Sequence, residues 1–324
     1  MKAWIGEGAG RSAVFREATL PTPAPRRGEV LLRVRAVGLN LVDRFPKTQH
    51  FSHTPPAPAA IPGMEAAGEI AALGEGVQDR RVGERVMAMV QGGCVEYVCV
   101  HSSLLMSVPA TMDWSFAAAI PVSFLTAHDA LVTNGRFARG DAVLVQGATT
   151  GVGLAALQLA RLGGASLVAG TSRSAEKLER ARPLGLQLPI TSSVVSEAVL
   201  AATAGRGADV VLDHLGARVL NETLRATAVG GRIVNIGRYA GTRGEIDLEM
   251  LALRRLSLIG VTFRTRSLEE HAAVVAKFME QHAGDLEAAR LRPVIDQVMA
   301  FDELPAAMER AASGEQFGKL VLVV

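Results

Sequence analysis

DAVLVQGATTGVGLAALQLARLGGA, residues 141–165, joins a short apolar run to a turn of small residues and then to an amphipathic segment. This order predicts a buried strand, a tight turn and a helix, which is the setting of a dinucleotide-binding fingerprint. Two of the three glycines of the usual GxGxxG spacing are absent, because its positions hold Ala148, Thr150 and Gly153. Gly147 and Gly151 compensate in part, and a tight turn without a ligand is the alternative.

Small side chains in such a turn let the backbone approach a pyrophosphate closely. The free N–H groups at the start of the helix and the positive end of its dipole then hold the phosphate oxygens. The stretch therefore predicts a phosphate-binding loop formed by Ala148, Thr149, Thr150, Gly151, Val152 and Gly153.

The next strand is expected to end about 20 residues after the loop, where NAD-binding proteins carry an Asp or Glu for the adenosine ribose. Here the sequence is VAGTSRSAEKLE, residues 168–179, with no carboxylate at the strand end. A 2′-phosphate would meet hydroxyl groups and two cations there. The sequence therefore favours NADPH over NADH, with Thr171, Ser172, Arg173 and Lys177 as the expected partners. Surface cations that only decorate the start of a helix are the alternative.

Two patterns divide the chain. Residues 29–108 consist of short apolar runs broken by Gly and Pro, which predicts an all-β module. After about residue 113, strand patterns alternate with helical ones, which predicts a parallel sheet with right-handed crossovers. Strands are expected at 141–145, 166–170, 208–212, 232–236 and 256–262, and helices at 151–162, 175–184, 195–204 and 219–228.

The C-terminal segment adds a helix and a strand. In SLEEHAAVVAKFMEQHAG, residues 267–284, Ser267 and Glu270 form a capping box that predicts where the helix begins. Gly284 is expected to end this helix. The closing GKLVLVV, residues 318–324, predicts a strand that pairs back into the β module.

Composition limits the classes of function. The chain has 324 residues, 49% of them hydrophobic, and a formal net charge of +2. This length suffices for two domains with full cores, and the interspersed charges offer no field that would gather nucleic acid or anionic lipid. No stretch reaches the roughly 20 apolar residues of a membrane span, and no signal peptide is evident, so we expect a cytoplasmic protein. Cys94 and Cys99 are too few for a disulfide framework or a four-thiolate zinc lobe.

Several further motifs give the chain a recognisable likeness. They are VGLNLVD (37–43), IPGMEAAGEI (61–70), AAAIPVSFLTAHDAL (117–131), GADVVLDHLG (207–216), GGRIVNIG (230–237) and FGKLVLVV (317–324). Together with the phosphate loop, they resemble the medium-chain dehydrogenase/reductase superfamily in order and spacing over nearly the full length. Within it, the chain resembles the zinc-independent quinone oxidoreductase and zeta-crystallin branch.

The resemblance implies an α/β fold of two domains. A GroES-like, β-rich catalytic domain would comprise residues 1–118 and 264–324, and a Rossmann domain with a doubly wound parallel sheet, residues 119–263, would bind NADPH. The active site would lie in the cleft between them. The resemblance also implies a homodimer, formed edge to edge through the nucleotide-domain sheet at residues 256–263.

The same resemblance bears on metal binding. Zinc-dependent relatives have a cysteine where this chain has Asn40 and a histidine where it has Met64. Neither side chain replaces a thiolate or an imidazole as a zinc ligand. His50 and His53 lie three apart but have no third ligand nearby in the sequence. We therefore expect no metal.

Residue roles also follow from the resemblance. Asn40 is expected near the nicotinamide as a hydrogen-bond donor, with Asp43 on the same turn, and a purely structural turn is the alternative. The other residues expected to contact the cofactor are Thr126, Leu215, Ile236, Gly237, Arg238, Phe263, Arg264 and Lys319.

The chain departs from the family at two places. Relatives often have tyrosines after the Asn and Asp motif, whereas Phe45 and Phe51 stand here, on which a flat apolar acceptor could stack. Near the adenine phosphate, where many relatives have a tyrosine, Ser192 or Ser193 is the expected substitute.

The missing metal ligands narrow the expected chemistry. A hydride can pass directly from a nicotinamide to a strongly activated acceptor held close to it. Quinones and alkenes conjugated to a carbonyl spread the arriving charge onto oxygen, whereas an unactivated alcohol or ketone needs a Lewis acid. The expected function is an NADPH-dependent quinone reductase. The alternatives are a reductase of α,β-unsaturated carbonyl compounds and a weakly catalytic, crystallin-like NADPH-binding protein.

Overall fold

The computed structural model describes the chain except residues 9, 46–49, 55–58 and 192–193. The chain forms two units. The β-rich unit consists of Met1–Leu125 and Phe263–Val324, and the parallel-sheet unit consists of Thr126–Thr262. The first border thus follows residue 125 rather than the expected 118, inside helix α2 (Pro121–His128), and the second follows residue 262 rather than 263.

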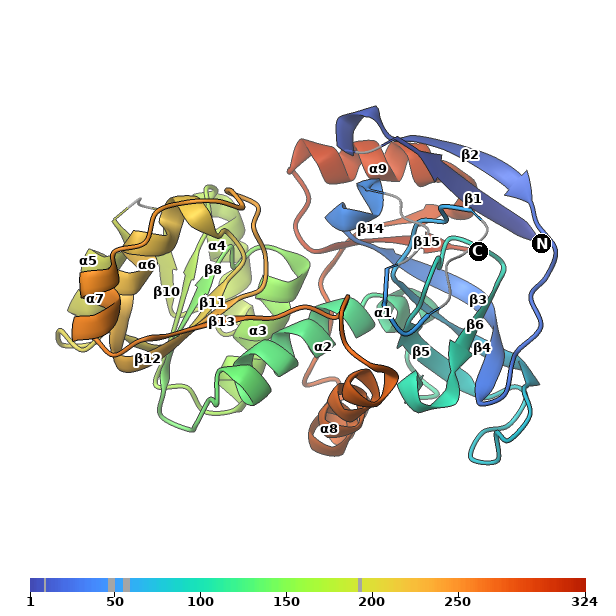
Figure 1. Ribbon diagram of the computed structural model, residues 1–324, viewed down its shortest axis with the longest axis horizontal. Helices are drawn as coiled ribbons and strands as arrows, with labels where there is room; N and C mark the ends of the chain where they lie inside the picture. The colour runs from blue at the N-terminus through green and yellow to red at the C-terminus, as the bar shows by residue number, and fades with distance from the viewer. Residues whose placement is uncertain (9, 46–49, 55–58, 192–193) are drawn as a thin grey trace. The chain divides into compact units, whose positions relative to one another are not determined.

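The parallel-sheet unit is built on six strands in the order β10-β9-β8-β11-β12-β13 (Figure 1). Every neighbouring pair in this order is parallel. The strands are β8 (Ala142–Gln146), β9 (Leu167–Thr171), β10 (Leu188–Ile190), β11 (Ala208–Asp213), β12 (Thr227–Asn235) and β13 (Ser257–Gly260). The strand order reverses between β8 and β11, and at such a point the carboxyl ends of the strands leave room for a ligand.

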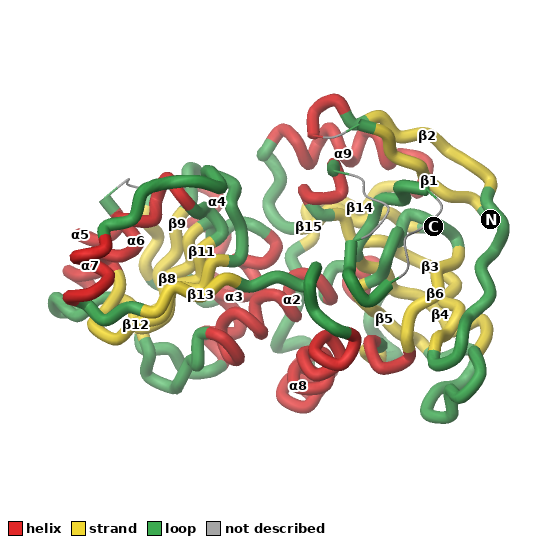
Figure 2. Tube along the Cα trace, in the orientation of Figure 1, coloured by secondary structure: helices red, strands yellow, loops and turns green. Residues whose placement is uncertain are grey.

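Helices connect these strands and cover both faces of the sheet (Figures 1 and 2). They are α3 (Gly151–Leu162), α4 (Ala175–Ala181), α5 (Val195–Ala202), α6 (Leu220–Ala226) and α7 (Leu248–Leu253). The predicted ends of α3 are confirmed, whereas α4 ends before the predicted residue 184. Pro183 has no N–H to continue the helix, so Arg182–Leu184 forms a single 3-10 turn.

The apolar runs of the sequence explain why this sheet is central. All five residues of β8 are buried, as expected for a parallel strand covered on both faces. Leu144 packs in one apolar cluster with Val211 of β11, Ile233 of β12 and Leu224 of α6. This buried cluster holds the strands and α6 together. The candidate site residues lie at the carboxyl ends of these strands.

The β-rich unit contains a seven-stranded sheet in the order β14-β15-β3-β4-β5-β7, and β6 also pairs with β3. The strands are β3 (Glu29–Leu39), β4 (Glu65–Leu73), β5 (Arg85–Met89), β6 (Tyr97–His101), β7 (Met106–Ser107), β14 (Ile295–Ala300) and β15 (Lys319–Val323), while β1 (Lys2–Glu7) and β2 (Val14–Thr19) form a separate pair. The predicted return of the C-terminal strand is confirmed, because β15 pairs antiparallel with β3. The two units together confirm the expected α/β fold class.

The helices of the β-rich unit include α1 (Trp114–Ala118), α8 (Leu268–Glu287) and α9 (Leu304–Ser313). The capping box of α8 is confirmed, since Ser267 Oγ accepts from the Glu270 N–H at 3.2 Å and Glu270 Oε2 accepts from the Ser267 N–H at 2.8 Å. The prediction that Gly284 ends this helix is wrong. The buried Leu286, 2% exposed, stabilises nearly another turn.

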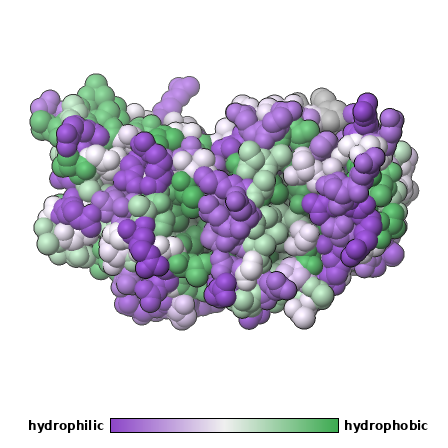
Figure 3. All heavy atoms as spheres, turned by 90° about the horizontal axis from the view of Figure 1, so that it is seen from below, coloured by the Kyte–Doolittle hydropathy of each residue, from purple (hydrophilic) through white to green (hydrophobic). Residues whose placement is uncertain are grey.

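Hydrophilic and hydrophobic residues are interspersed over the face drawn in Figure 3. The large apolar side chains that are exposed include Leu248 and Leu253 of α7 and Leu258 of β13. Among the helices of the described residues, none is long and apolar enough to cross a membrane.

Candidate active site

The phosphate loop between β8 and α3 is held in shape by its own hydrogen bonds. Gly147 has a φ of +77°, and Thr150 Oγ1 donates to the Gly147 carbonyl at 3.0 Å. The same hydroxyl accepts from the Gly153 N–H at 3.0 Å and so caps the helix. The N–H groups of Gly151 and Val152 open α3 without a partner inside it, and they are therefore available to an anion.

Space explains which glycines the loop retains. A Cβ atom at Gly153 would lie 2.6 Å from the Gly147 carbonyl oxygen and 2.7 Å from that of Ala148. A Cβ at Gly170 of β9 would lie 2.6 Å from the Ala148 Cβ. The incomplete fingerprint thus keeps the glycine that the backbone needs, and Thr150 contributes a cap that a glycine could not.

A chain of buried polar groups ties the loop to the sheet. Thr171 Oγ1 accepts from the Gly147 N–H at 3.1 Å and donates to Gln146 Oε1 at 2.8 Å. Gln146 Nε2 donates in turn to Thr223 Oγ1 of α6 at 3.0 Å. The Thr171 hydroxyl thus already takes part in two hydrogen bonds within the protein. Its contact with the 2′-phosphate of NADPH stays a prediction.

The end of β9 meets the loop directly. Ser172 Oγ lies 3.0 Å from Thr149 Oγ1. Arg173 is exposed, and Lys177 lies in the first turn of α4, where its N–H donates to Ser174 Oγ at 3.2 Å. Glu176 is an exposed carboxylate in the same turn. The structure therefore brings Ser172 beside the phosphate loop, and Arg173 and Lys177 follow it at the start of a second helix.

The carboxyl ends of β11 and β12 are joined through Asp213. Asp213 Oδ1 accepts from the N–H groups of Leu215 and Gly216 at 2.8 and 3.0 Å. Asn235 Nδ2 donates to Asp213 Oδ2 at 3.1 Å. These bonds shape the turn that carries Leu215, one of the residues predicted to contact the cofactor.

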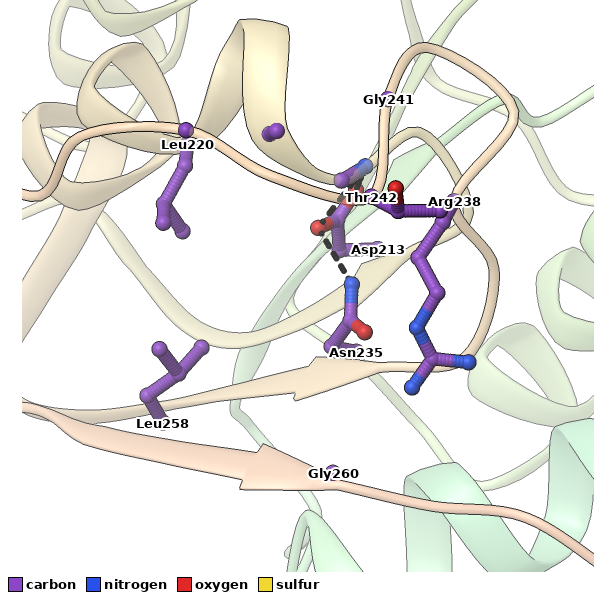
Figure 4. Close-up of a pocket in the computed structure, with 11 residues that line it drawn as sticks. Asp213, Leu220, Asn235, Arg238, Gly241, Thr242, Leu258 and Gly260 are labelled. Atoms are coloured by element: carbon purple, nitrogen blue, oxygen red, sulfur yellow. Dashed lines mark hydrogen bonds between the residues drawn. The ribbon is translucent and has the colours of Figure 1, made fainter.

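A hollow of about 340 Å³ opens beside this turn (Figure 4). Leu220 and Leu258 lie on opposite sides of it, and Arg238 and Asn235 also line it. Of the predicted cofactor residues, Arg238 therefore lines the hollow. Ile236 and Gly237 lie between the end of β12 at Asn235 and Arg238.

His214 is buried next to the phosphate loop. A Cβ at Gly147 would lie 3.3 Å from the His214 Cβ. Burial lowers the pKa of His214 to about 4. The imidazole is therefore neutral near pH 7 and adds no charge to the loop.

In the β-rich unit, Asn40, Glu65 and Lys319 meet where β3 ends and where β4 and β15 begin. Lys319 Nζ donates to Asn40 Oδ1 at 2.7 Å and also to Glu65 Oε1. Asn40 Nδ2 donates to the same Glu65 oxygen at 3.0 Å, which closes a ring of three side chains. Glu65 and Lys319 are buried, with 0% and 4% exposure, whereas Asn40 is half-buried.

Asp43 holds the turn on which Asn40 stands. It lies in the 3-10 helix Leu41–Arg44 and is fully buried. Its Oδ2 accepts from the Asn40 N–H at 2.7 Å, and its Oδ1 accepts from the Gly63 N–H at 3.3 Å. Burial raises the pKa of Asp43 to about 7, although the hydrogen bonds and the charge of Lys319 lower it. Asp43 is therefore partly protonated near neutral pH.

The donor set of this cluster does not fit zinc. A zinc site requires thiolates, imidazoles or carboxylates directed at one point. Here Asn40 Oδ1 and Glu65 Oε1 both accept from the ammonium of Lys319, and the neighbouring Met64 offers only a thioether. The described part of the chain contains no group of three or more His, Cys, Asp or Glu side chains that could hold a metal ion.

The two phenylalanines predicted to meet a substrate have different surroundings. Phe51 is 1% exposed, and its ring centroid lies 5.7 Å from His53 and 5.5 Å from His271. His53 Nε2 lies 3.1 Å from His271 Nδ1, and the Phe263 ring lies 4.9 Å from His271. Phe45 is 45% exposed. Phe51 and Phe263 thus belong to one buried aromatic cluster, and their contacts with ligands stay predictions.

The remaining predicted residues are dispersed. Thr126 lies on α2, Arg264 is an exposed residue of the β-rich unit, and Ser192 and Ser193 lie outside the described residues. Glu65 and Gln146 were not predicted from the sequence. The sequence shows only that Glu65 follows Met64 and that Gln146 ends an apolar strand. Neither position reveals the partner that the side chain binds far along the chain.

Two family models match parts of the chain. Residues 26–110 match the model described as alcohol dehydrogenase GroES-like domain, and residues 151–280 match the model described as zinc-binding dehydrogenase. The first match covers much of the β-rich unit, and the second begins at the phosphate loop.

Curated relatives match almost the whole chain. The human synaptic vesicle membrane protein VAT-1 homolog is 33% identical, over 93% of this chain and 80% of that protein. The quinone oxidoreductase of Lama guanicoe is 30% identical, over 99% of this chain and 96% of that enzyme.

Solved structures match the fold over its full extent. A mycobacterial protein complexed with NADPH has a TM-score of 0.84 and 25% identity, and all of both chains is covered. The CurK enoyl reductase has a TM-score of 0.82 and 25% identity, over 99% of this chain and 98% of that one.

Proposed function

Since the chain belongs to the zeta-crystallin-like branch of the medium-chain dehydrogenase/reductase superfamily, we propose that it is an NADPH-dependent, zinc-independent quinone oxidoreductase. Its relatives support oxidoreductase activity of this superfamily on a small molecule. The observation that carries the finer proposal is the contact of Ser172 with Thr149 of the phosphate loop, because Arg173 and Lys177 follow Ser172 at the start of α4.

NADPH fits the residues of this edge. The N–H groups of Gly151 and Val152 would hold the pyrophosphate at the start of α3. Arg173 and Lys177 would bind the 2′-phosphate, because charge-assisted hydrogen bonds to phosphate are strong and orienting. The similarity to a protein complexed with NADPH supports the same choice.

A quinone suits the donors that the β-rich unit offers. Bound NADPH supplies the hydride. Asn40 is the half-buried member of its ring and would donate a hydrogen bond to the acceptor oxygen on which negative charge develops. Because Lys319 occupies Asn40 Oδ1 and Glu65 Oε1, we propose that no zinc takes part. The similarity to quinone oxidoreductases supports the acceptor class.

Reduction of an α,β-unsaturated carbonyl compound is the nearest rival, and the similarity to an enoyl reductase favours it. The hydride step and the hydrogen bond to oxygen would be the same, because a conjugated alkene also passes charge to its carbonyl oxygen. A third candidate is a binding protein that holds NADPH tightly with little turnover. Such a protein would bind NADPH tightly but would reduce neither quinones nor enones at a measurable rate.

A panel of acceptors tests the proposal. Initial rates of NADPH oxidation are measured with several quinones and several conjugated enones, with and without prior treatment by a metal chelator. The proposal predicts turnover of quinones that the chelator does not change. Activity confined to simple alcohols with NAD, or a loss on chelation that added zinc restores, would overturn it.

The proposal includes a homodimer in the cytoplasm. β13 is an edge strand of the six-stranded sheet, and an unpaired edge can accept a second copy. Leu258 on β13 and Leu248 and Leu253 on the adjoining α7 are 43%, 66% and 70% exposed. Burial of these side chains in a symmetric contact would support such a dimer, and sedimentation of the purified chain would measure it.

A further inference from the structure

The ring of Asn40, Glu65 and Lys319 has a defined direction. The ammonium of Lys319 can only donate hydrogen bonds, and it donates to Asn40 Oδ1 and to Glu65 Oε1. The carboxylate of Glu65 accepts on both oxygens, because Oε1 accepts from Lys319 and Asn40 and Oε2 accepts from the Val122 N–H at 2.8 Å. The Asn40 amide completes the ring with one acceptor and one donor.

This arrangement allows one orientation of the Asn40 amide. A half turn about its last bond would place Nδ2 against the ammonium and Oδ1 against the carboxylate. Both new contacts would be repulsive, and two hydrogen bonds to charged groups would be lost. The backbone of Asn40 is fixed as well, because its N–H donates to Asp43 at 2.7 Å.

The ring leaves one N–H of the amide for other uses. A primary amide nitrogen carries two hydrogens, and Glu65 takes one of them. Among the described residues, the acceptor given for the other is the Gly38 carbonyl oxygen, which lies 3.5 Å from the nitrogen, at the limit of a hydrogen bond. Asn40 is also the half-buried member, while the two charged members are buried.

We propose that Glu65 and Lys319 are positioning residues that hold the Asn40 amide with its second N–H directed to the oxygen of the bound acceptor. This rests on the proposed function, and it assigns Lys319 to Asn40, whereas the resemblance to the family implied that Lys319 contacts the cofactor. The ion pair thereby supplies orientation, while Asn40 supplies the contact with the acceptor.

Three variants separate these roles. The double variant Glu65→Gln with Lys319→Met removes both charges together, so that neither is left buried alone. Lys319→Arg keeps a cationic donor that can reach two acceptors. Lys2→Met exchanges an exposed lysine of β1 for methionine and is the control for the same Lys-to-Met exchange outside the ring. Thermal unfolding shows that each variant is folded.

NADPH affinity and kcat, measured on the folded variants, distinguish a positioning role of Lys319 from direct contact of Lys319 with the cofactor. For the double variant we expect NADPH affinity within about 3-fold of the parent and a kcat for quinone reduction about 100-fold lower, as for the loss of one oriented donor. Lys319→Arg should recover most of this kcat, and Lys2→Met should match the parent. An NADPH affinity at least about 10-fold weaker with kcat unchanged at saturation would overturn the proposal.

Solvent exchange of the Asn40 side-chain amide tests the ring without any turnover. The exchange is measured by NMR. In the parent, we expect the Asn40 amide proton that is hydrogen-bonded to Glu65 to exchange at least about 10-fold more slowly than the second proton of the same amide, because it is held in a buried ring. In the double variant this difference should shrink, because the amide oxygen introduced by Glu65→Gln is a weaker acceptor than the carboxylate and Lys319→Met removes the bond to Asn40 Oδ1. Equal exchange in the parent would overturn the positioning role. A parent that reduces neither quinones nor enones would overturn the proposed function instead, and the exchange rates would still decide the ring.

Discussion

Asp43 accepts a hydrogen bond from the backbone N–H of Asn40 at 2.7 Å, from a position with no exposed surface. The carboxyl group thus fixes the turn that presents Asn40 while burial raises its pKa to about 7. An aspartate that keeps its proton up to neutral pH makes the folded state sensitive to pH in the direction opposite to an aspartate in a salt bridge.

The stability of the fold should therefore fall as pH rises from about 4 to 7 through the contribution of Asp43. In this interval the unfolded chain has lost the proton, since its ordinary pKa is 3.8, and the folded chain still binds it. A shift of about 3 units corresponds to about 4 kcal/mol. The free energy of unfolding is measured with urea at several pH values for the parent and for Asp43→Asn. The value for the parent minus the value for the variant should fall as pH rises over this interval. Asp79→Asn, at an exposed side chain, is the control, and a pH-independent difference for Asp43→Asn would contradict the pKa.

His271 should produce the opposite dependence. Burial, together with the charges of His53 and Arg266, lowers the pKa of His271 from 6.5 to about 3. Below pH 6.5 this histidine binds a proton in the unfolded chain but stays neutral in the folded chain. The free energy of unfolding therefore falls as pH falls. At pH 5 the loss should be about 2 kcal/mol. His271→Phe keeps a ring in the cluster and removes the titrating group, so its unfolding free energy should fall less than the parent's between pH 7 and 5. Parallel curves for the two proteins would exclude this role of His271.

Two glycines should respond in opposite ways to alanine. Gly153→Ala would place a Cβ 2.6 Å from the Gly147 carbonyl oxygen, so the phosphate loop must shift. NADPH affinity, measured by the change in its fluorescence on binding, should fall by at least about 10-fold. Gly284→Ala meets open space inside α8 and should stabilise the fold by about 0.5–1 kcal/mol without changing that affinity. A Gly153→Ala variant that binds NADPH like the parent would show that the loop does not depend on this close packing.

Local sequence predicted the elements whose ends are set locally. The start of α3 followed from the turn of small residues before it, where the structure shows that Thr150 caps the helix, and the start of α8 followed from the box of Ser267 and Glu270. The end of α8 was wrong because burial of Leu286 is a tertiary contact that the glycine rule does not contain. Boundaries set by caps are therefore readable, and boundaries set by packing are not.

The candidate site divides in the same way. The phosphate loop and the end of β9 lie about 20 residues apart, as in other dinucleotide-binding units, so the sequence could join them. Lys319 is 254 residues from Glu65 and 279 from Asn40, and no local pattern shows that the three meet. The burial of Phe51 follows likewise from its contact with His271 of α8. The sequence therefore indicated Asn40 and Lys319 as site residues but not what they do for each other.

The proposed preference for NADPH over NADH depends on Arg173 and Lys177. The value of kcat/KM for NADPH and for NADH is measured with one quinone, on the parent and on the double variant Arg173→Ala with Lys177→Ala. Arg180→Ala, at an exposed arginine in the last turn of α4, is the matched control for loss of a cation on the same helix.

We expect the parent to prefer NADPH by at least about 10-fold, the double variant to lose this preference because its kcat/KM for NADPH alone falls, and Arg180→Ala to keep it. A parent that uses NADH equally well, or a double variant in which both cofactors weaken by the same factor, would contradict it.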